Sequence, residues 1–178
     1  MRKLHTHELG RSKADEALHS PKLPVALVLD NIRSALNVGS IFRSADALAA
    51  SRLILCGITA CPPHREILKT ALGSTASVDW GYCETTEAAL RQLKEAGYRL
   101  WAAEQTDPST PLHHWRPEAD TPCAIVLGNE VSGVSEEALA LCDGALEIPQ
   151  FGAKHSLNVA VAAGIILWEA ARQLKLRD

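Results

Sequence analysis

Short apolar runs alternate with stretches of helical periodicity along most of the chain. Runs of five to eight mostly apolar residues bounded by Gly, Asp or Pro are typical of buried strands. Apolar residues repeated every three or four positions are typical of amphipathic helices. The pattern predicts strands at residues 25–30, 52–58, 76–83, 98–105, 123–129 and 144–150. It predicts helices at residues 13–19, 38–50, 64–72, 85–97, 135–142 and 156–177.

This alternation predicts an α/β fold, because strands with near-continuous apolar character belong to mostly parallel sheets with helices on both faces. The residues at 107–122 are predicted to form a loop. Thr85 or Thr86, Ser135 and Ser156 are the expected helix N-caps. We expect a basic N-terminal appendage at 1–23 and one domain at 24–178, since 47% apolar residues suffice for an ordinary core.

Composition excludes several classes of protein. No apolar segment approaches the roughly 18 residues that span a bilayer, and no signal-peptide core follows the N-terminus, which predicts a soluble, cytoplasmic protein without a membrane partner. The five cysteines lack CxxC spacing and mostly lie in or beside apolar runs, so we expect reduced core residues. Cys61 and His64 are the only candidate metal pair, and we predict no metal site.

The net charge of −3 argues against a surface that binds polyanions generally. The charge is nevertheless uneven, because residues 1–75 hold ten Lys and Arg against six Asp and Glu, whereas residues 76–178 hold eight against fifteen. This asymmetry permits a basic face for phosphate contacts, and it is equally compatible with solvated surface charge.

Candidate chemistry follows three of the predicted strands, where ligands bind in open parallel sheets. After the first strand, Asn37 is either an N-cap or a functional residue. Arg43, in the second turn of the next helix, suits a phosphate or a developing oxyanion, with an ordinary surface salt bridge as the alternative. The loop at 127–133 places Glu130 between Gly128 and Gly133, where its carboxylate either caps a neighbouring backbone N–H or faces a ligand. The glycine spacing matches neither a dinucleotide-binding nor a triphosphate-binding loop.

The third of these loops, at 148–158, ends in Ser156 and Asn158 at the start of the last helix. A helix start offers unpaired N–H donors, and the small residues that follow allow close packing against another backbone. His155, beside Lys154, is more typical of a solvated loop residue than of a catalytic one.

Together these loops resemble the SpoU/TrmH family of the SPOUT superfamily, which are RNA ribose 2′-O-methyltransferases. The resemblance rests on "NVGSIFR" at 37–43, "GNEVSG" at 128–133 and "IPQFGAKHSLNVAVAAGIILWEA" at 148–170, and it covers approximately residues 24 to 172. It implies a deep C-terminal trefoil knot, S-adenosylmethionine (AdoMet) as cofactor, RNA as substrate and a homodimer. Pattern reasoning alone would give an unknotted sheet.

The resemblance also implies residue roles. The positions that match cofactor-binding ones are Gly128, Ile148, Leu157, Ser156 and Ala103. The positions that match the catalytic constellation are Arg43, Asn37, Glu130, Ser156 and Asn158. Because a guanidinium effectively never deprotonates, we expect Arg43 to hold a phosphate and stabilise a 2′-alkoxide, although a role as base stays open. Ala160 replaces a serine that is common in the family.

A ribose 2′-OH requires RNA rather than DNA. With about 23 residues before the first predicted strand, we expect no separate N-terminal RNA-binding domain, and this expectation favours tRNA over rRNA. The appendage has basic residues that either contact phosphates or are disordered: Arg2, Lys3, Arg11, Lys13 and Lys22. The alternatives are an RNA-binding protein that has lost catalysis, a base-methylating SPOUT enzyme and an α/β enzyme whose loops match by chance.

Overall fold

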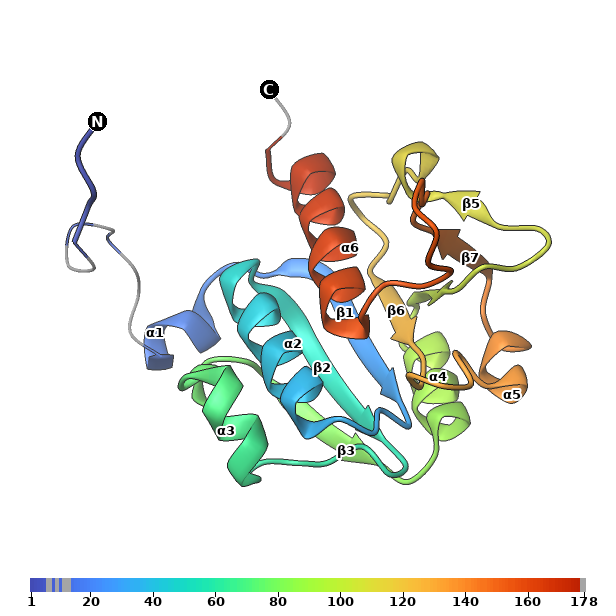
Figure 1. Ribbon diagram of the computed structural model, residues 1–178, viewed down its shortest axis with the longest axis horizontal. Coiled ribbons are helices and arrows are strands. Elements are labelled where there is room, and N and C mark those ends of the chain that lie inside the picture. The colour runs from blue at the N-terminus through green and yellow to red at the C-terminus, as the bar shows by residue number, and fades with distance from the viewer. Residues whose placement is uncertain (6–7, 9, 11–13, 177–178) are drawn as a thin grey trace.

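A single parallel sheet forms the centre of the protein. The computed structural model describes residues 1–5, 8, 10 and 14–176. The strands lie in the order β3-β2-β1-β6-β4-β7-β5, and every paired neighbour is parallel (Figure 1). Their bounds are β1 Leu23–Asp30, β2 Ala50–Cys56, β3 Trp80–Cys83, β4 Arg99–Ala103, β5 Thr110–Pro111, β6 Cys123–Leu127 and β7 Gly144–Glu147.

Helices cover both faces of the sheet, as predicted. The α-helices are α1 Ala14–His19, α2 Ala35–Ala47, α3 Arg65–Ala71, α4 Thr86–Glu95, α5 Glu136–Leu139 and α6 Val159–Leu174. The short segments η2 Ser74–Ala76 and η3 Leu112–His114 are 3-10 helices. Buried residues of α2, α3 and α6 share one core cluster, and those of α4 and α5 share the other. The predicted α/β class with a parallel sheet is therefore confirmed.

Strand β1 shows why its residues read as one apolar run. Leu27 and Leu29 belong to the core cluster under α2 and α6, whereas Ala26 and Val28 belong to the cluster under α4. All four are fully buried. A strand that is covered on both faces has no solvent-facing position for a polar side chain. Its sequence therefore lacks the alternation of apolar and polar residues that marks a half-exposed strand.

The predicted elements are confirmed in kind, with some wrong boundaries. Helix α2 begins at Ala35, because Ser34 and not Asn37 is its N-cap, and the Ser34 hydroxyl accepts a hydrogen bond from the Asn37 amide at 3.3 Å. Helix α6 begins at Val159, so the prediction of Ser156 as N-cap was wrong. Asn158 has that role, since its Oδ1 accepts from the amides of Ala160 at 2.9 Å and Val161 at 3.4 Å.

Three further predictions concern loop and cap positions. The predicted loop at 107–122 contains the short strand β5 and η3, which the sequence pattern does not signal. Thr85 is the N-cap of α4. Ser135 precedes α5 as expected, but its hydroxyl donates to Asp30 at 2.8 Å instead of capping the helix. The predicted first helix starts at Lys13, which lies outside the described residues.

The last helix returns from the β7 side of the sheet to pack beside α2 and over β1 (Figure 1). Within the part of the chain that the structure describes, no helix is both long and apolar enough to cross a membrane. Burial raises the pKa of the Cys56 and Cys123 thiols to about 12. Both thiols are therefore protonated, as expected for core cysteines.

Candidate active site

A cavity opens at the carboxyl edge of the sheet. The loops after β4, β6 and β7 and the start of α6 enclose approximately 740 Å³, within the range of about 300–1,000 Å³ that is typical of small-molecule sites. All five predicted cofactor positions line it: Ala103, Gly128, Ile148, Ser156 and Leu157. The structure thus brings together residues from three segments that lie far apart in the chain.

The glycines of the loop after β6 permit a very tight turn. Asn129 and Gly133 exchange two backbone hydrogen bonds of 2.9 Å. A Cβ on Gly128 would overlap the Gly133 carbonyl carbon and the Val134 amide nitrogen. Gly133 has a φ of +72°, and a Cβ there would overlap the Glu104 carboxylate. Only glycine fits either position, so the two glycines permit the tight turn by which this loop lines the cavity.

A chain of hydrogen bonds joins three of the predicted catalytic residues. The Asn37 amide Nδ2 donates to the Glu130 Oε1 at 2.9 Å, and the Asn158 Nδ2 donates to the Asn37 Oδ1 at 3.1 Å. The backbone amides of Arg33 and Ser34 donate to the two Glu130 oxygens at 2.9 and 3.0 Å. Glu130 thereby connects the loop after β6 to the start of α2, and the hydrogen bond between Asn37 and Asn158 connects α2 to the start of α6.

Glu130 is ionised at neutral pH. Partial burial acts to raise the pKa of its carboxyl, but the hydrogen bonds from Arg33, Asn37 and Ser34 outweigh burial and hold the pKa below its ordinary value. The carboxylate also lies at the N-terminus of α2, where the helix dipole favours an anion. Its two oxygens receive three donors, so it acts as an acceptor that fixes Asn37 in place.

A buried aspartate anchors the loop after β1. Asp30 is 1% exposed, and its Oδ1 accepts from the Thr86 hydroxyl at 2.6 Å. Its Oδ2 accepts from the Ser135 amide and hydroxyl, both at 2.8 Å. Next to it, the Asn31 carbonyl accepts from the Asn129 side chain at 2.7 Å. These contacts hold the starts of α4 and α5 and the loop after β6 to the end of β1.

The sequence analysis missed the two residues that follow β4. This strand lies between β6 and β7, and Glu104 and Gln105 reach to either side of it. The Glu104 Oε2 accepts from the Val134 amide at 3.1 Å, and the Gln105 Nε2 donates to the His155 carbonyl at 2.8 Å. They connect the two motif loops that wall the cavity. The sequence analysis placed both inside the predicted strand at 98–105, and their polarity at the end of that apolar run was the one signal that they lie beyond it.

Arg43 and Ser156 are arranged differently from the other predicted catalytic residues. Ser156 lines the cavity, but its hydroxyl forms no hydrogen bond with the described residues. Arg43 is exposed two turns along α2 and lines a separate hollow between α2 and α3. The single chain thus brings Asn37 together with Glu130 and Asn158, which line the cavity, and does not bring Arg43 into that group.

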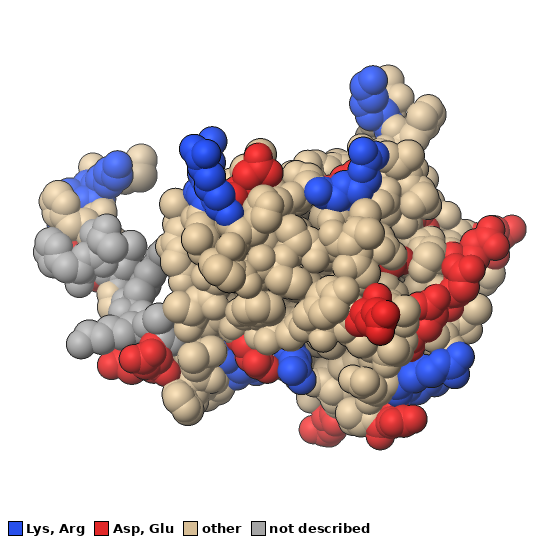
Figure 2. All heavy atoms as spheres, turned by 90° about the horizontal axis from the view of Figure 1, so that it is seen from below, with Lys and Arg blue, Asp and Glu red and all other residues tan. Residues whose placement is uncertain are grey.

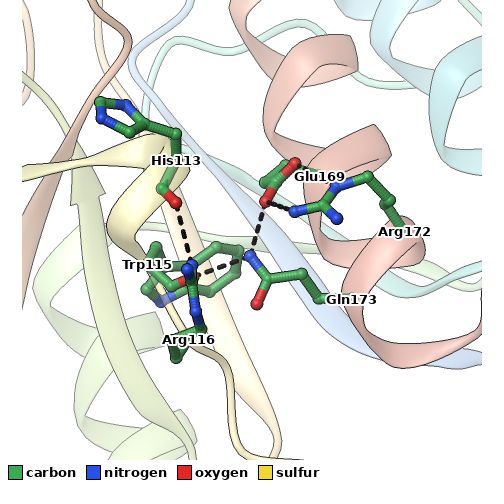
Figure 3. Close-up of polar contacts among 6 residues, drawn as sticks. All are labelled: His113, Trp115, Arg116, Glu169, Arg172 and Gln173. Carbon is green, nitrogen blue, oxygen red and sulfur yellow. Dashed lines mark hydrogen bonds and ion pairs between the residues drawn. The ribbon is translucent and has the colours of Figure 1, made fainter. Parts of the chain in front are cut away.

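The far half of α6 is fixed by a second polar cluster, outside the cavity (Figure 3). Gln173 is 5% exposed, and its Nε2 donates to the Trp115 carbonyl at 2.7 Å and to the Glu169 Oε1 at 2.6 Å. Arg116 donates to the same Trp115 carbonyl at 2.8 Å, and Arg172 pairs with Glu169 at 2.7 Å. The helix whose N-terminus closes the cavity is therefore anchored to the segment after β5.

Charge is distributed unevenly around the carboxyl edge. In Figure 1 the arrowheads of β1 and β2 point toward the lower edge, which Figure 2 views from below. Acidic side chains gather toward one side of this face, and uncharged surface covers its middle. Among the described residues that line the cavity, four are glutamates (Glu104, Glu130, Glu136 and Glu147) and none is Lys or Arg. An acidic lining favours a ligand that carries positive charge.

Comparisons with known proteins point in one direction. The SpoU rRNA Methylase family matches residues 24–168. The tRNA (guanosine(18)-2′-O)-methyltransferase of Thermus thermophilus is 34% identical over 166 residues, which cover 93% of this chain and 84% of that protein. A 23S rRNA (guanosine-2′-O-)-methyltransferase of Vibrio parahaemolyticus is 31% identical, with 93% of this chain and 66% of that protein covered.

Solved structures with the same fold include a TrmH/SpoU tRNA modifying enzyme from A. aeolicus, with a TM-score of 0.79, 28% identity and coverage of 90% of this chain and 80% of that one. An AdoMet-bound rRNA methyltransferase from Sinorhizobium meliloti has a TM-score of 0.78 and 31% identity, covering 86% of this chain and 61% of that one. The chain therefore spans most of the length of the tRNA-modifying relatives and about two thirds or less of the rRNA-modifying ones.

Proposed function

The chain belongs to the SpoU rRNA methylase family, and from this premise we propose that it is an AdoMet-dependent RNA methyltransferase that modifies a ribose 2′-OH. The observation that carries the proposal is the cavity, where all five expected cofactor positions meet beside the hydrogen-bonded Asn37, Glu130 and Asn158. We propose tRNA as the substrate class, because the Thermus thermophilus relative that the chain spans to 84% is a tRNA enzyme.

The cavity fits AdoMet in size and in chemistry. We propose that Gly128, Ile148 and Leu157 hold it largely through backbone groups, with Ser156 and Ala103 beside them. Gly128 allows the tight turn that forms one wall of the cavity, and the glutamates of the lining suit a cation. When bound, the cofactor supplies an electrophilic methyl group on a sulfonium.

The chain's own residues then have two tasks, to orient the ribose and to stabilise negative charge on its oxygen. Asn37 and Asn158 present amide groups whose positions Glu130 fixes. We propose that Arg43, which the single chain keeps outside the cavity, holds a phosphate of the bound RNA and stabilises the 2′ oxygen as that oxygen loses its proton to water and takes the methyl group from the sulfonium. The Arg43 guanidinium is free to do this, since it has no hydrogen bond or ion pair with the described residues.

A homodimer is the proposed assembly. Val161, Ile165 and Trp168 lie at i, i+4 and i+7 on α6, and they are 51%, 37% and 54% exposed. An apolar stripe with helical spacing on an otherwise packed helix is expected to be covered, and a second copy covers it symmetrically.

We also propose, from the family, that the segment around 148–174 forms a trefoil knot; its last helix packs over β1. We propose the same division of the chain as above, with a basic appendage at 1–23 and a catalytic domain at 24–178. The cytoplasm is the proposed location, because the proposed substrate is tRNA.

The test is methyl transfer from radiolabelled AdoMet to unfractionated tRNA and, in parallel, to rRNA. The products are digested to nucleosides and separated by mass. The proposal expects a 2′-O-methylated nucleoside from tRNA, and an Asn158→Ala variant that transfers far less. Label on a base would identify a base-methylating enzyme. AdoMet binding without transfer to either RNA would identify a protein that has lost catalysis.

A further inference from the structure

A second hollow lies between α2 and α3, outside the cofactor cavity. It measures approximately 520 Å³ and has two cationic side chains on its rim, Arg43 from α2 and Lys69 from α3. Three hydroxyl side chains also line it, those of Ser40, Ser44 and Thr70. Among its described lining residues there is no Asp or Glu.

Close contact between the two helices brings the cations to one rim. A Cβ on Gly39 would overlap the Thr70 hydroxyl and the Ile67 carbonyl, so glycine is needed for the helices to touch. The Thr70 hydroxyl donates to the Leu36 carbonyl of α2 at 2.9 Å. Arg43 lies one turn beyond Gly39, and Lys69 is the neighbour of Thr70. The glycine of the first motif therefore determines how near Arg43 and Lys69 lie.

Neither cation has a partner within the described chain. Arg43 and Lys69 form no ion pair or side-chain hydrogen bond with the described residues. The nearest acid along α2, Asp46, accepts from the Ser77 hydroxyl and does not line the hollow. Two unpaired like charges at one concave site repel each other, and an anion between them removes that repulsion.

We propose that this hollow binds a backbone phosphate of the substrate RNA, with Lys69 as a phosphate ligand beside Arg43. The inference rests on the proposed function, because it takes RNA as the substrate. Asn37 and Arg43 are six residues apart, or about 9 Å along the helix axis. A nucleic-acid strand covers this span in about three nucleotides at a rise of roughly 3.4 Å. A strand held at the hollow thus reaches the start of α2, where Asn37 lies.

The experiment measures how tRNA affinity depends on salt. Fluorescently labelled unfractionated tRNA is titrated with the full chain and with Lys69→Ala, Lys69→Arg and Arg91→Ala at 50 to 200 mM KCl. Arg91 is the matched control, because it is an exposed cation on α4, across the sheet from the hollow. Cofactor affinity and melting temperature of each variant are measured in parallel to check folding.

Loss of one phosphate contact lowers the slope of log affinity against log salt by about 0.7 to 0.9. Between 50 and 200 mM KCl, wild-type affinity should therefore fall about 3-fold more than that of Lys69→Ala. Lys69→Arg should keep the wild-type slope, and so should Arg91→Ala.

A Lys69→Ala slope equal to that of wild type or of Arg91→Ala would overturn the inference and leave the proposed function standing. Wild-type protein that binds the cofactor but no tRNA at any salt concentration would overturn both.

Discussion

Glu130→Gln tests whether the carboxylate organises the polar site. The Glu130 oxygens receive three donors, the amides of Arg33 and Ser34 and the side chain of Asn37. A glutamine oxygen can keep the two donors that Oε1 receives, but its NH₂ group then faces the remaining N–H. One hydrogen bond is lost, and two donors point at each other.

The expected magnitude follows from this count. A hydrogen bond to a charged acceptor contributes about 1.5–3 kcal/mol. Glu130 is solvent-exposed over part of its surface, and screening reduces the loss to about 1 kcal/mol. A loss of about 1 kcal/mol lowers by about fivefold the ratio of molecules in which Asn37 is held in place to those in which it is not. We expect Glu130→Gln to lower both the free energy of unfolding and the methyl-transfer rate by these amounts.

The assay combines urea unfolding with methyl transfer at saturating cofactor. Glu137→Gln is the matched control, since Glu137 is exposed on α5, its side chain has no hydrogen bond or ion pair with the described residues, and it does not line the cavity. Glu130→Gln and Asn37→Ala should also be strongly non-additive, because both disrupt one chain of hydrogen bonds. Additive effects of the two substitutions, or equal effects of Glu130→Gln and Glu137→Gln, would refute the reasoning.

The pH dependence has a defined sign. The pKa of Glu130 is lower in the folded protein than its ordinary value. Its contribution to stability is therefore fully present above the unfolded pKa of about 4.3 and is lost as the pH falls through the folded value. The stability difference between wild type and Glu130→Gln should be constant from pH 6 to 8 and shrink in acid. A difference that grows below pH 4 would contradict this assignment.

Three further substitutions have separable outcomes. Arg43→Ala should lower turnover about a hundredfold, equivalent to about 3 kcal/mol, and leave cofactor affinity by calorimetry unchanged; near-wild-type turnover would remove its assigned role. Gly128→Ala should cost about 1–3 kcal/mol of stability and weaken cofactor binding, because the new Cβ meets Gly133; unchanged affinity would show that the turn adapts. Gln105→Ala should weaken cofactor binding about 2- to 5-fold without changing the melting temperature, since an exposed hydrogen bond of about 1 kcal/mol or less to His155 is lost; a lower melting temperature with unchanged affinity would give it a purely structural role.

The order of strands in the sheet explains which parts of the site the sequence could predict. Strand ends follow from local pattern, and Gly128 and Ile148 are the first residues after β6 and β7. The pairing of β4 between β6 and β7 is a long-range property that no local pattern encodes. Glu104 and Gln105 were missed for that reason, since their importance depends on which loops flank their strand.

The helix caps show a related limit. Ser34, Asn37, Ser156 and Asn158 are all good N-cap residues, and propensity alone does not choose between members of a pair. The structure uses Ser34 and Asn158, because Asn37 is held by Glu130 from a loop 93 positions away in the chain. A tertiary contact thus decided a local choice at the start of α2, whereas Asn158 both caps α6 and donates to Asn37.

The proposed RNA substrate and the proposed AdoMet cofactor together explain why the first part of the chain is basic and the remainder acidic. The first 75 residues carry the excess of basic side chains and supply α2 and α3, with Arg43 and Lys69 at the hollow. The acidic remainder of the chain supplies the cavity lining with its glutamates. The proposed substrate is a polyanion and the proposed cofactor a sulfonium cation, so each ligand meets the opposite charge. A net charge of −3 is thus compatible with RNA binding, because the basic residues act locally at one face and need not outnumber the acidic ones in the whole chain.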